Sequence, residues 1–420
     1  MKSFYQILGA IGLIGLLAFT SEFGKGKNRI SENGDITIPA GFKAVVVADN
    51  VGNARHLTVS PNGDVYVKLE RLKDGKGILR LRDNNGDGQA DDITGFGNYV
   101  GTGIAISNGF LYASSNSEVF RYKMNNGVAD SATAERIVQG LVDRRQHNSK
   151  SITLDNKGNI YVNIGAPSNA CQERDRQKGS KGQDPCPILE TAGGIWQFKV
   201  DKPNQSYAEG SRYATGLRNV VGLDWNTETN QLFVTQHGRD MLFQHYPELF
   251  NEEQGAELPS EEMLQVSQGD NFGWPYCYYD QIKKQKLLNP EYGGDGKTAG
   301  RCESIKKPVV AFPGHIGPNG LLFYTGNQFP AKYKNGAFVA FHGSWNRAPR
   351  PQEGYFVVFV PMKNGKATGD YEIFADGFAG EFKDPSKARF RPCGLAQGPD
   401  GSLYISDDQK GRIWKVTYSK

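Results

Sequence analysis

Residues 57–67 read LTVSPNGDVYV, in which alternating apolar residues flank an Asn-Gly turn. This pattern predicts a β-hairpin. Five further segments have a similar pattern: IAISNGFLYAS (104–114), ITLDNKGNIYV (152–162), LDWNTETNQLFV (223–234), GLLFYTGNQFPAKYKNGAFVA (320–340) and LAQGPDGSLYIS (395–406). The first three begin about 47 residues apart, a spacing typical of β-propeller blades. We therefore predict an all-β fold, a six-bladed β-propeller.

The two ends of the propeller are predicted to close the ring. The segments FKAVVVA (42–48) and RIWKVTY (412–418) each have the composition of a strand, and we expect them to share one blade. A two-sheet sandwich is the alternative architecture. Six similar hairpins favour the radial arrangement over the sandwich.

Helix is expected to be a minor component of the fold. The sequence suggests it only near residues 247–253 and 259–266. The long segments 166–192 and 237–270 are expected to contain functional loops on one face, because long loops in a compact all-β domain usually carry function.

Composition excludes some classes of protein. The 420 residues are 38% hydrophobic and include 52 Gly, which is enough apolar material for a core and excludes wholesale disorder. There are 49 Lys and Arg against 45 Asp and Glu, a net charge of +4. This net positive charge is too small for a dedicated nucleic-acid-binding protein, so nucleic acid is not an expected partner.

The N-terminus indicates export. Lys2 precedes an apolar run from Ile7 to Phe19, which fits a signal peptide and is too short for a full membrane span. We expect residues 1–20 to be a signal peptide or an N-terminal anchor, 21–34 a linker and 35–420 the propeller domain. The predicted location is periplasmic or secreted, with a membrane anchor if the N-terminus stays uncleaved. A buried N-terminal helix is the other interpretation.

The five cysteines suit an oxidising compartment. Cys171 and Cys186 bracket one polar segment, and Cys277 and Cys302 bracket another, so proximity favours these two disulfides with Cys393 left free. Four cysteines allow three connectivities, and spacing alone does not choose among them. There is no CxxC or CxxCH motif, which argues against a zinc knuckle and a c-type haem.

Residues 83–92 read DNNGDGQADD and resemble the first part of a calcium-binding loop. Oxygen ligands stand at every second position and Gly88 stands at the sixth, where such loops turn sharply. The predicted ligands are Asp83, Asn85, Asp87, Gln89 and Asp91. Thr94 occupies the twelfth position in place of the usual Glu, so Asp91 or Asp92 would have to replace it. The alternative is an ordinary Asx-rich turn.

Histidines and arginines recur beside the hairpins. The six His have no metalloprotease spacing, but His147 immediately precedes the third hairpin, where an inner strand would begin at the channel. Four arginines lie at comparable places beside four hairpins: Arg55, Arg218, Arg347 and Arg391. If they converge at one mouth, they form a basic ring suited to a ligand with several carboxylates.

Several longer segments together carry a family resemblance. These are QHNSKSITLDNKGNIYVNIGAPSNAC (146–171), ATGLRNVVGLDWN (214–226), HGRD (237–240), QGDNFGWPYC (268–277), HGSWNR (342–347) and RPCGLAQGPDGSLYISDD (391–408). They resemble the glucose/sorbosone dehydrogenase family of soluble quinoproteins, and most of all its sorbosone dehydrogenase-like branch. The resemblance covers roughly residues 35–418. It implies a six-bladed propeller, with pyrroloquinoline quinone (PQQ) held non-covalently at the channel mouth and a calcium ion beside it.

The resemblance also implies roles for individual residues. His147 matches the general base, and Arg218 and Asn219 match the pair near the quinone carbonyls. Gly238 and Arg239 match the loop whose backbone carbonyls hold calcium. The remaining match is a clamp on the PQQ carboxylates, to which Arg391 contributes and which Arg55 and Arg347 are expected to join.

The chain departs from the glucose-oxidising branch at two positions. Ala166 stands where that branch has the Asp that orients the histidine, and Arg239 replaces a Pro. The carboxylate that orients His147 is therefore unassigned, and glucose specificity does not transfer.

These features lead to one hypothesis and two alternatives. The chain is expected to oxidise a sugar or a sugar-derived aldehyde or alcohol by hydride transfer to PQQ, assisted by calcium and by His147 as base. Lacking a haem motif, it would pass electrons to a separate cytochrome or quinone. No strand-linked GxGxxG motif suggests a dinucleotide cofactor. The alternatives are a calcium-dependent sugar lactonase, which has no need of the arginine ring, and a non-enzymatic extracellular propeller that binds glycan or protein.

Overall fold

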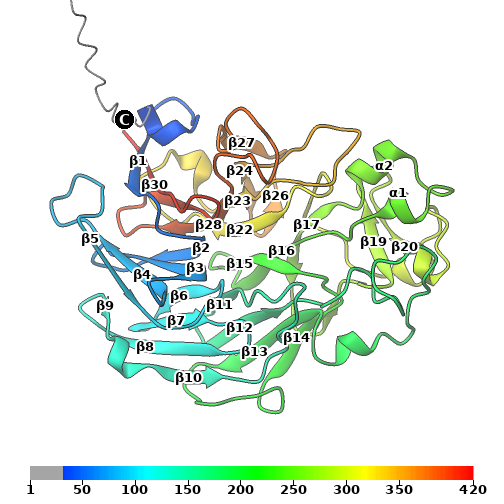
Figure 1. Ribbon diagram of the computed structural model, residues 1–420, viewed down its shortest axis with the longest axis horizontal. Coiled ribbons are helices and arrows are strands. Elements are labelled where there is room, and N and C mark those ends of the chain that lie inside the picture. Colours follow the sequence, from blue (N-terminus) through cyan, green and yellow to red (C-terminus); the bar gives the residue numbers. More distant parts are fainter. Residues whose placement is uncertain (1–31, 420) are drawn as a thin grey trace, which may run out of the picture. The chain divides into compact units, whose positions relative to one another are not determined.

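The computed structural model describes residues 32–419, and their strands form six antiparallel blades around a central axis (Figure 1). The first three blades follow the chain in order. Blade 1 contains β2 (Ala54–Val59), β3 (Val65–Lys73), β4 (Lys76–Arg82) and β5 (Asp92–Phe96); blade 2 contains β6 (Ile104–Ser107), β7 (Phe110–Ser114), β8 (Val119–Asn125) and β10 (Glu135–Val138), with β9 (Val128–Ala129) paired to β8; blade 3 contains β11 (Ile152–Leu154), β12 (Asn159–Ile164), β13 (Gly194–Lys199) and β14 (Ser211–Thr215), with β18 (Asp270–Asn271) added in parallel.

The other three blades complete the ring. Blade 4 contains β15 (Val220–Asn226), β16 (Gln231–Gln236), β17 (Glu261–Val266) and β21 (Val310–Phe312); blade 5 contains β22 (Pro318–Phe323), β23 (Ala337–Phe341), β24 (Phe356–Val360) and β27 (Glu372–Ala375); blade 6 contains β28 (Pro392–Gln397), β29 (Leu403–Asp407), β30 (Ile413–Tyr418) and β1 (Phe42–Ala48). The predicted six-bladed propeller is confirmed, and each predicted hairpin supplies the first two strands of a blade.

Ring closure is also confirmed. Strand β1 pairs antiparallel with β30, from Phe42 opposite Tyr418 to Ala48 opposite Ile413. The Phe42 ring lies 4.8 Å from that of Phe329 and 5.0 Å from that of Phe374, both edge-to-face, so the N-terminal strand is packed against blade 5 as well. Aromatic contacts of this kind strengthen the closure beyond their burial alone.

The helical elements are short, and most of them lie in loops between strands. The described residues contain α1 (Leu242–His245), α2 (Glu252–Glu257) and 3₁₀ turns at Glu32–Asp35, Ser131–Thr133, Pro187–Glu190, Pro290–Tyr292, Gly300–Cys302 and Ala331–Tyr333. Two small hairpins complete the inventory: β19 (Cys277–Asp280) with β20 (Gln285–Leu288), and β25 (Met362–Lys363) with β26 (Lys366–Ala367). Figure 1 shows α1, α2, β19 and β20 gathered together at one side of the ring.

The prediction of helix at 259–266 was wrong. Residues 261–266 form β17, which hydrogen-bonds with β16 on one side and β21 on the other. Burial between two strands overrides the local sequence, in which Pro259 and two glutamates resemble the start of a helix. The helix expected at 247–253 is displaced: α2 begins at Glu252 because Asn251 and Gln254 form a capping box there.

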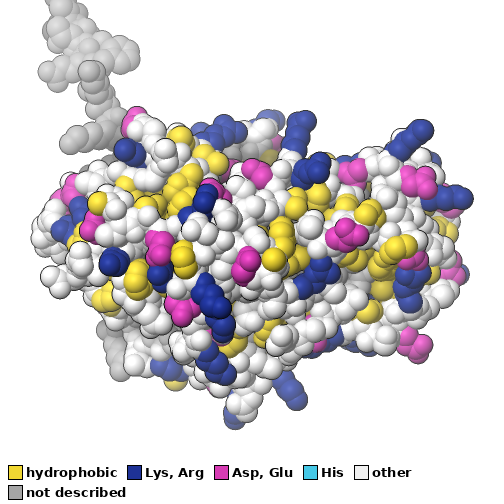
Figure 2. Space-filling view, turned by 90° about the horizontal axis from the view of Figure 1, so that it is seen from below, with side chains coloured by type: hydrophobic (Ala, Val, Ile, Leu, Met, Phe, Trp, Pro, Cys, Tyr) yellow, Lys and Arg dark blue, Asp and Glu magenta, His cyan; other side chains and the backbone are white. Residues whose placement is uncertain are grey.

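The inner strand of every blade lines the central channel. At the end nearest the hairpin turns, the channel encloses about 330 Å³ and is lined by segments of β2, β6, β11, β15, β22 and β28. Lys and Arg side chains are interspersed with Asp and Glu on the face shown in Figure 2.

No helix in the described part of the chain is long and apolar enough to cross a membrane. The predicted leader 1–20 and most of the linker 21–34 lie outside the described residues.

Candidate functional site

The candidate site lies at the end of the channel where the inner strands begin. Because the first two strands of each blade are antiparallel, residues preceding a first strand meet residues that follow a second strand. Arg218 and Asn219 precede β15, and the segment 237–240 follows β16. His147 lies just before β11, and His342 and Asp408 directly follow β23 and β29. The predicted convergence of blade edges is therefore observed.

His147 is held in one orientation by the backbone. Its Nδ1 lies 2.6 Å from the carbonyl oxygen of Ala166. A carbonyl only accepts, so Nδ1–H donates and Nε2 keeps a free lone pair in the neutral ring. Burial, and then the charge of Arg218, lowers the pKa of His147 to about 3. The ring is consequently neutral near pH 7, in the form that a general base requires.

The segment containing Gly165 and Ala166 is shaped around this histidine. A Cβ added at Gly165 would lie 2.5 Å from the His147 carbonyl oxygen and 2.9 Å from Asn219 Oδ1, so no larger residue fits. Ala166 is fully buried. Its backbone carbonyl orients the His147 ring, a role that was expected of a carboxylate side chain. Sequence reasoning missed it because a backbone acceptor has no side-chain signature.

Arg218 is the centre of a buried polar network with Asp240 and Asn169. Its guanidinium donates to Asp240 Oδ2 at 2.9 Å, to Asn169 Oδ1 at 3.0 Å and to the Gly238 carbonyl at 2.8 Å. Arg176 donates to the same Asp240 oxygen at 2.9 Å. Although burial alone would raise it, the Arg218 charge holds the pKa of Asp240 well below its usual range. The network therefore places fixed positive charge close to His147.

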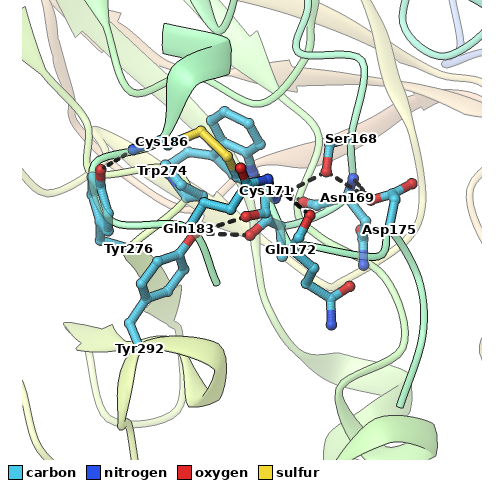
Figure 3. Close-up of a disulfide and its surroundings, with 12 residues drawn as sticks. Ser168, Asn169, Cys171, Gln172, Asp175, Gln183, Cys186, Trp274, Tyr276 and Tyr292 are labelled. Atoms are coloured by element: carbon cyan, nitrogen blue, oxygen red, sulfur yellow. Dashed lines mark hydrogen bonds between the residues drawn. A yellow bond between two sulfur atoms is a disulfide. The ribbon is translucent and has the colours of Figure 1, made fainter. Parts of the chain in front are cut away.

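A disulfide loop positions Asn169 in this network. Figure 3 shows the Cys171–Cys186 disulfide beside Trp274. In the same turn, Ser168 Oγ accepts a hydrogen bond from the Cys171 N–H, and Asp175 accepts one from the Asn169 N–H. Trp274 Nε1 donates to the Asn169 carbonyl at 3.0 Å. The second disulfide joins Cys277 to Cys302, and Cys393 is free and buried, so the predicted pairing is confirmed.

A second cluster joins Arg55, His342 and Asp408. Arg55 Nη1 donates to Asp408 Oδ2 at 2.7 Å, and His342 Nε2 lies 2.6 Å from Asp408 Oδ1. Burial lowers the pKa of His342, although Asp408 opposes that shift. Arg391 Nε donates to the His342 carbonyl at 2.9 Å. Two of the predicted clamp residues are thus linked to His342, Arg55 through Asp408 and Arg391 through the His342 carbonyl.

Arg347 is held in a separate network. Its guanidinium donates to the carbonyls of Ala256 and Gly314 at 3.0 and 2.7 Å and to Glu257 Oε1 at 2.7 Å. The contacts with Ala256 and Glu257 hold α2 against the HGSWNR segment. That segment reaches the main network through Asn346, which donates to Asp240 Oδ1 at 3.1 Å. A direct contact of Arg347 with a cofactor stays a prediction.

The predicted metal ligands fall into two separate places. Gly238 lies in the site, where its N–H donates to the buried Glu261 at 2.8 Å and its carbonyl accepts from Arg218. The Arg239 side chain turns away to Glu291, with 2.5 Å between Nη1 and Oε2. Within residues 32–419, no group of three or more His, Cys, Asp or Glu side chains could hold a metal ion. Calcium held by backbone carbonyls at 238–239 stays a prediction.

The loop with Asp83, Asn85, Asp87, Gln89 and Asp91 connects β4 to β5 and borders the hairpin turns at 61–63 and 399–400. It is therefore at the opposite end of the blades from His147. Asp83 accepts from the N–H groups of Gly86 and Gly88 at 2.7 and 2.8 Å. Asp91 faces the loop, accepting from the Asn84 N–H at 2.7 Å, whereas Asp92 pairs with Arg80. Of the two candidates for the missing ligand, Asp91 has the better position.

Buried polar atoms at the mouth give a test of cofactor fit. Among the described residues, atoms without a hydrogen-bond partner include Asn219 Oδ1, His237 Nε2, Asn319 Oδ1, Asn346 Oδ1 and Arg55 Nε. Such atoms are costly in a folded protein unless a ligand or water satisfies them. Donors and acceptors of this kind, beside the guanidinium groups of Arg55 and Arg391, fit a planar cofactor with carbonyl and carboxylate groups.

Fold and site together define a propeller with a neutral, oriented histidine beside fixed arginines at its channel mouth. The chain belongs to the TrAA12-like family, whose sequence pattern matches residues 36–419. This confirms the family resemblance inferred from the sequence.

Known proteins of similar sequence and fold are PQQ-dependent sugar dehydrogenases. The chain is 23% identical to the pyrroloquinoline quinone-dependent pyranose dehydrogenase of Coprinopsis cinerea, over 91% of this chain and 54% of that protein. The chain spans about half the length of the curated relatives it matches.

Solved structures show the same fold. The calcium structure of the Trichoderma reesei protein of carbohydrate-active enzyme family AA12 superimposes with a TM-score of 0.75 and 20% identity, covering 93% of this chain and 98% of that one. The holo form of the PQQ domain of Coprinopsis cinerea pyranose dehydrogenase gives a TM-score of 0.73 at 19% identity, covering 91% and 97%.

Proposed function

We propose that this chain is a PQQ-dependent dehydrogenase that oxidises a sugar or a sugar-derived aldehyde or alcohol. The observation that carries the proposal is the geometry of His147: a neutral ring with Nδ1–H committed to Ala166 and Nε2 available as a base. Membership of the TrAA12-like family supports the cofactor. An aldose- or sorbosone-type substrate is part of the proposal, as is export to the periplasm or beyond.

The residues at the mouth divide into holding and reacting groups. Arg218 and Asn219 would hold the quinone side of PQQ, and Arg55 and Arg391 would pair with its carboxylates, joined by Arg347. Calcium would bind to the backbone carbonyls of Gly238 and Arg239. PQQ, when bound, supplies the acceptor for the hydride that leaves the substrate carbon.

The reaction needs a group that removes the hydroxyl proton, and we assign that task to His147 Nε2. Transfer of the proton to Nε2 makes the ring cationic, with Nδ1–H still donating to the Ala166 carbonyl. The low pKa means that the ring gives the proton up again readily, so the free base is restored for the next turnover. The electrons would pass to a separate cytochrome or quinone.

The test is turnover of the purified protein loaded with PQQ and calcium. A dye acceptor is reduced in the presence of a panel of neutral aldoses, sugar acids and sugar aldehydes. We expect reduction with at least one member, and none without PQQ. Tight binding of PQQ without turnover of any sugar would contradict the dehydrogenase. Glycan binding that is independent of PQQ would instead favour the non-enzymatic propeller.

A further inference from the structure

A pocket of about 490 Å³ lies directly beside the His147 segment. One wall comes from residues 142–146, which lead from blade 2 to His147, and the other from residues 187–192 at the end of the disulfide loop. Val142, Pro167, Pro187 and Ile188 give it apolar surfaces, and two cationic residues, Arg144 and Arg145, also line it.

The pocket shares its walls with the candidate site. Two of its lining residues, Gln146 and Pro167, are the chain neighbours of His147 and Ala166, whose ring and carbonyl are hydrogen-bonded. Gln146 Oε1 also accepts from Arg176 Nε at 3.2 Å, and Arg176 pairs with Asp240. A ligand in the pocket therefore lies against the two segments that orient the proposed base.

Arg144 and Arg145 differ from the other arginines near the site. Arg55, Arg176, Arg218 and Arg347 are each paired with a carboxylate. Arg144 and Arg145 are exposed, and within residues 32–419 neither has a hydrogen bond or an ion pair. Neither guanidinium group is engaged by a carboxylate of the described residues, so both are available to a bound anion. Their planar donor sets match a carboxylate.

We propose that this pocket is a subsite for a carboxylate-bearing saccharide, so that the protein prefers sugar acids, such as uronic-acid units, over neutral sugars. The apolar surfaces suit the C–H faces of a pyranose ring, and the arginine pair suits its carboxylate. The proposal rests on the proposed function, because a dehydrogenase substrate must reach His147. Carboxylate recognition itself can be measured without turnover.

The test uses calorimetric binding to the full-length, cofactor-free protein. We expect glucuronate and galacturonate to bind at least about tenfold more tightly than glucose and galactose, the scale of a charge-assisted hydrogen bond. In Arg144→Gln with Arg145→Gln this preference should disappear. The matched control is Arg174→Gln with Lys178→Gln, which removes the same charge from exposed positions of the neighbouring loop outside the pocket lining and should keep the preference.

Several outcomes would overturn the subsite. Equal affinity for acidic and neutral sugars would do so, as would binding of none of the four. An equal loss in the control would show that general charge attraction, and not the pocket, binds the acids. Glucose 6-phosphate is tested as an additional ligand in the same calorimetric experiment. If it binds and the uronates do not, the site recognises phosphate and the carboxylate proposal fails.

Turnover separates this proposal from the proposed function. In the PQQ-loaded enzyme, the Arg144/Arg145 double variant should raise KM for a uronate about tenfold or more while leaving kcat unchanged. If no sugar of either kind is oxidised, the dehydrogenase fails, although uronate binding can still stand. If neutral sugars are oxidised as well as uronates and the variant changes neither, the dehydrogenase stands and the subsite fails.

Discussion

His147 carries its proton on Nδ1 because its partner, the Ala166 carbonyl, can accept but cannot donate. Replacing it with Gln keeps a polar group of similar size and removes the base. We expect His147→Gln to lower turnover by about 10²–10⁴, the usual contribution of a positioned base, without loss of folding or PQQ binding. The measurement is the rate at saturating PQQ divided by bound PQQ. A rate close to that of the wild type would reject His147 as the base.

Arg391→Ala is the matched comparison for that variant. Arg391 is proposed to hold a cofactor carboxylate and takes no part in proton transfer. Its loss should weaken PQQ binding about tenfold or more while leaving substantial turnover at saturating cofactor. Opposite effects of the two variants would distinguish a base from an anchor. Identical effects would indicate that both residues merely support the fold of the mouth.

The depressed pKa of His147 also predicts how stability depends on pH. Its pKa is about 3 in the folded protein, against an ordinary value of 6.5. Between those values the unfolded chain binds the proton and the native protein does not, so acidification destabilises the native state. His147→Gln removes this contribution, and its Tm should fall less than that of the wild type between pH 7 and pH 5. Parallel Tm curves would show that the ring is not held neutral.

The sequence predicted the functional side chains of the site better than the backbone groups that orient them. His147 and Arg218 could be singled out because each stands beside a recognisable hairpin, whereas Asn219 was identified only through the family resemblance. The Ala166 carbonyl, and Arg176 within the disulfide loop, could not. A carbonyl acceptor has no residue type, and the place of Arg176 depends on how a long loop folds back onto Asp240.

Hairpins are the elements that the sequence predicts best, because an Asn-Gly or Asp-Gly turn between alternating residues leaves few other structures. Strand β17 shows the limit. Glu261 is fully buried at its start, and burial raises the pKa of its carboxyl to about 7. From the sequence alone, a glutamate such as Glu261 is expected on the solvent-exposed face of a helix. It becomes a strand residue only through its neighbours β16 and β21.

The β4–β5 loop is the element whose predicted calcium site can be tested on its own. Asp83 accepts three backbone N–H groups, from Asn85, Gly86 and Gly88. We expect Asp83→Ala with Asp87→Ala to lower Tm by about 2–4 °C and to reduce the rise in Tm that calcium produces in the absence of PQQ. PQQ affinity should be unchanged, since the loop lies at the other end of the blades. A calcium-dependent rise in Tm that is equally large in the variant and the wild type, both without PQQ, would show that the loop is only an Asx-rich turn.

At the scale of the whole molecule, closure of the ring turns separate hairpins into one site. Pairing of β1 with β30 fixes blade 6 between blades 5 and 1. That brings Asp408, after β29, against Arg55 in β2 and His342 after β23. The arrangement could be anticipated from six repeats and two terminal strands. The arginines that face the mouth could not be anticipated in the same way, because Arg347 and Arg55 both stand beside hairpins and yet meet different carboxylates.

The stability of the whole ring is expected to depend on cofactor and calcium together. The proposed cofactor contacts come from three blades and the loops beside them: Arg55 in blade 1, Arg218 and Gly238 around blade 4, and Arg391 beside blade 6. A ligand bound only by the native state stabilises it, by about 2.7 kcal/mol at a hundredfold excess over its dissociation constant. We therefore expect PQQ with calcium to raise the Tm of the whole domain in one cooperative transition. PQQ with a chelator should raise it much less.

The Asp83→Ala/Asp87→Ala variant is the control, because it separates calcium at the mouth from calcium in the β4–β5 loop. In that variant the rise in Tm with PQQ should still require calcium, since the proposed mouth ligands are the carbonyls at 238–239. If PQQ raises Tm equally with and without chelator, the cofactor is held by the arginines alone and calcium has no place beside it. If the requirement for calcium disappears only in the variant, the essential ion belongs to the β4–β5 loop, and its effect on PQQ must be transmitted along the blades.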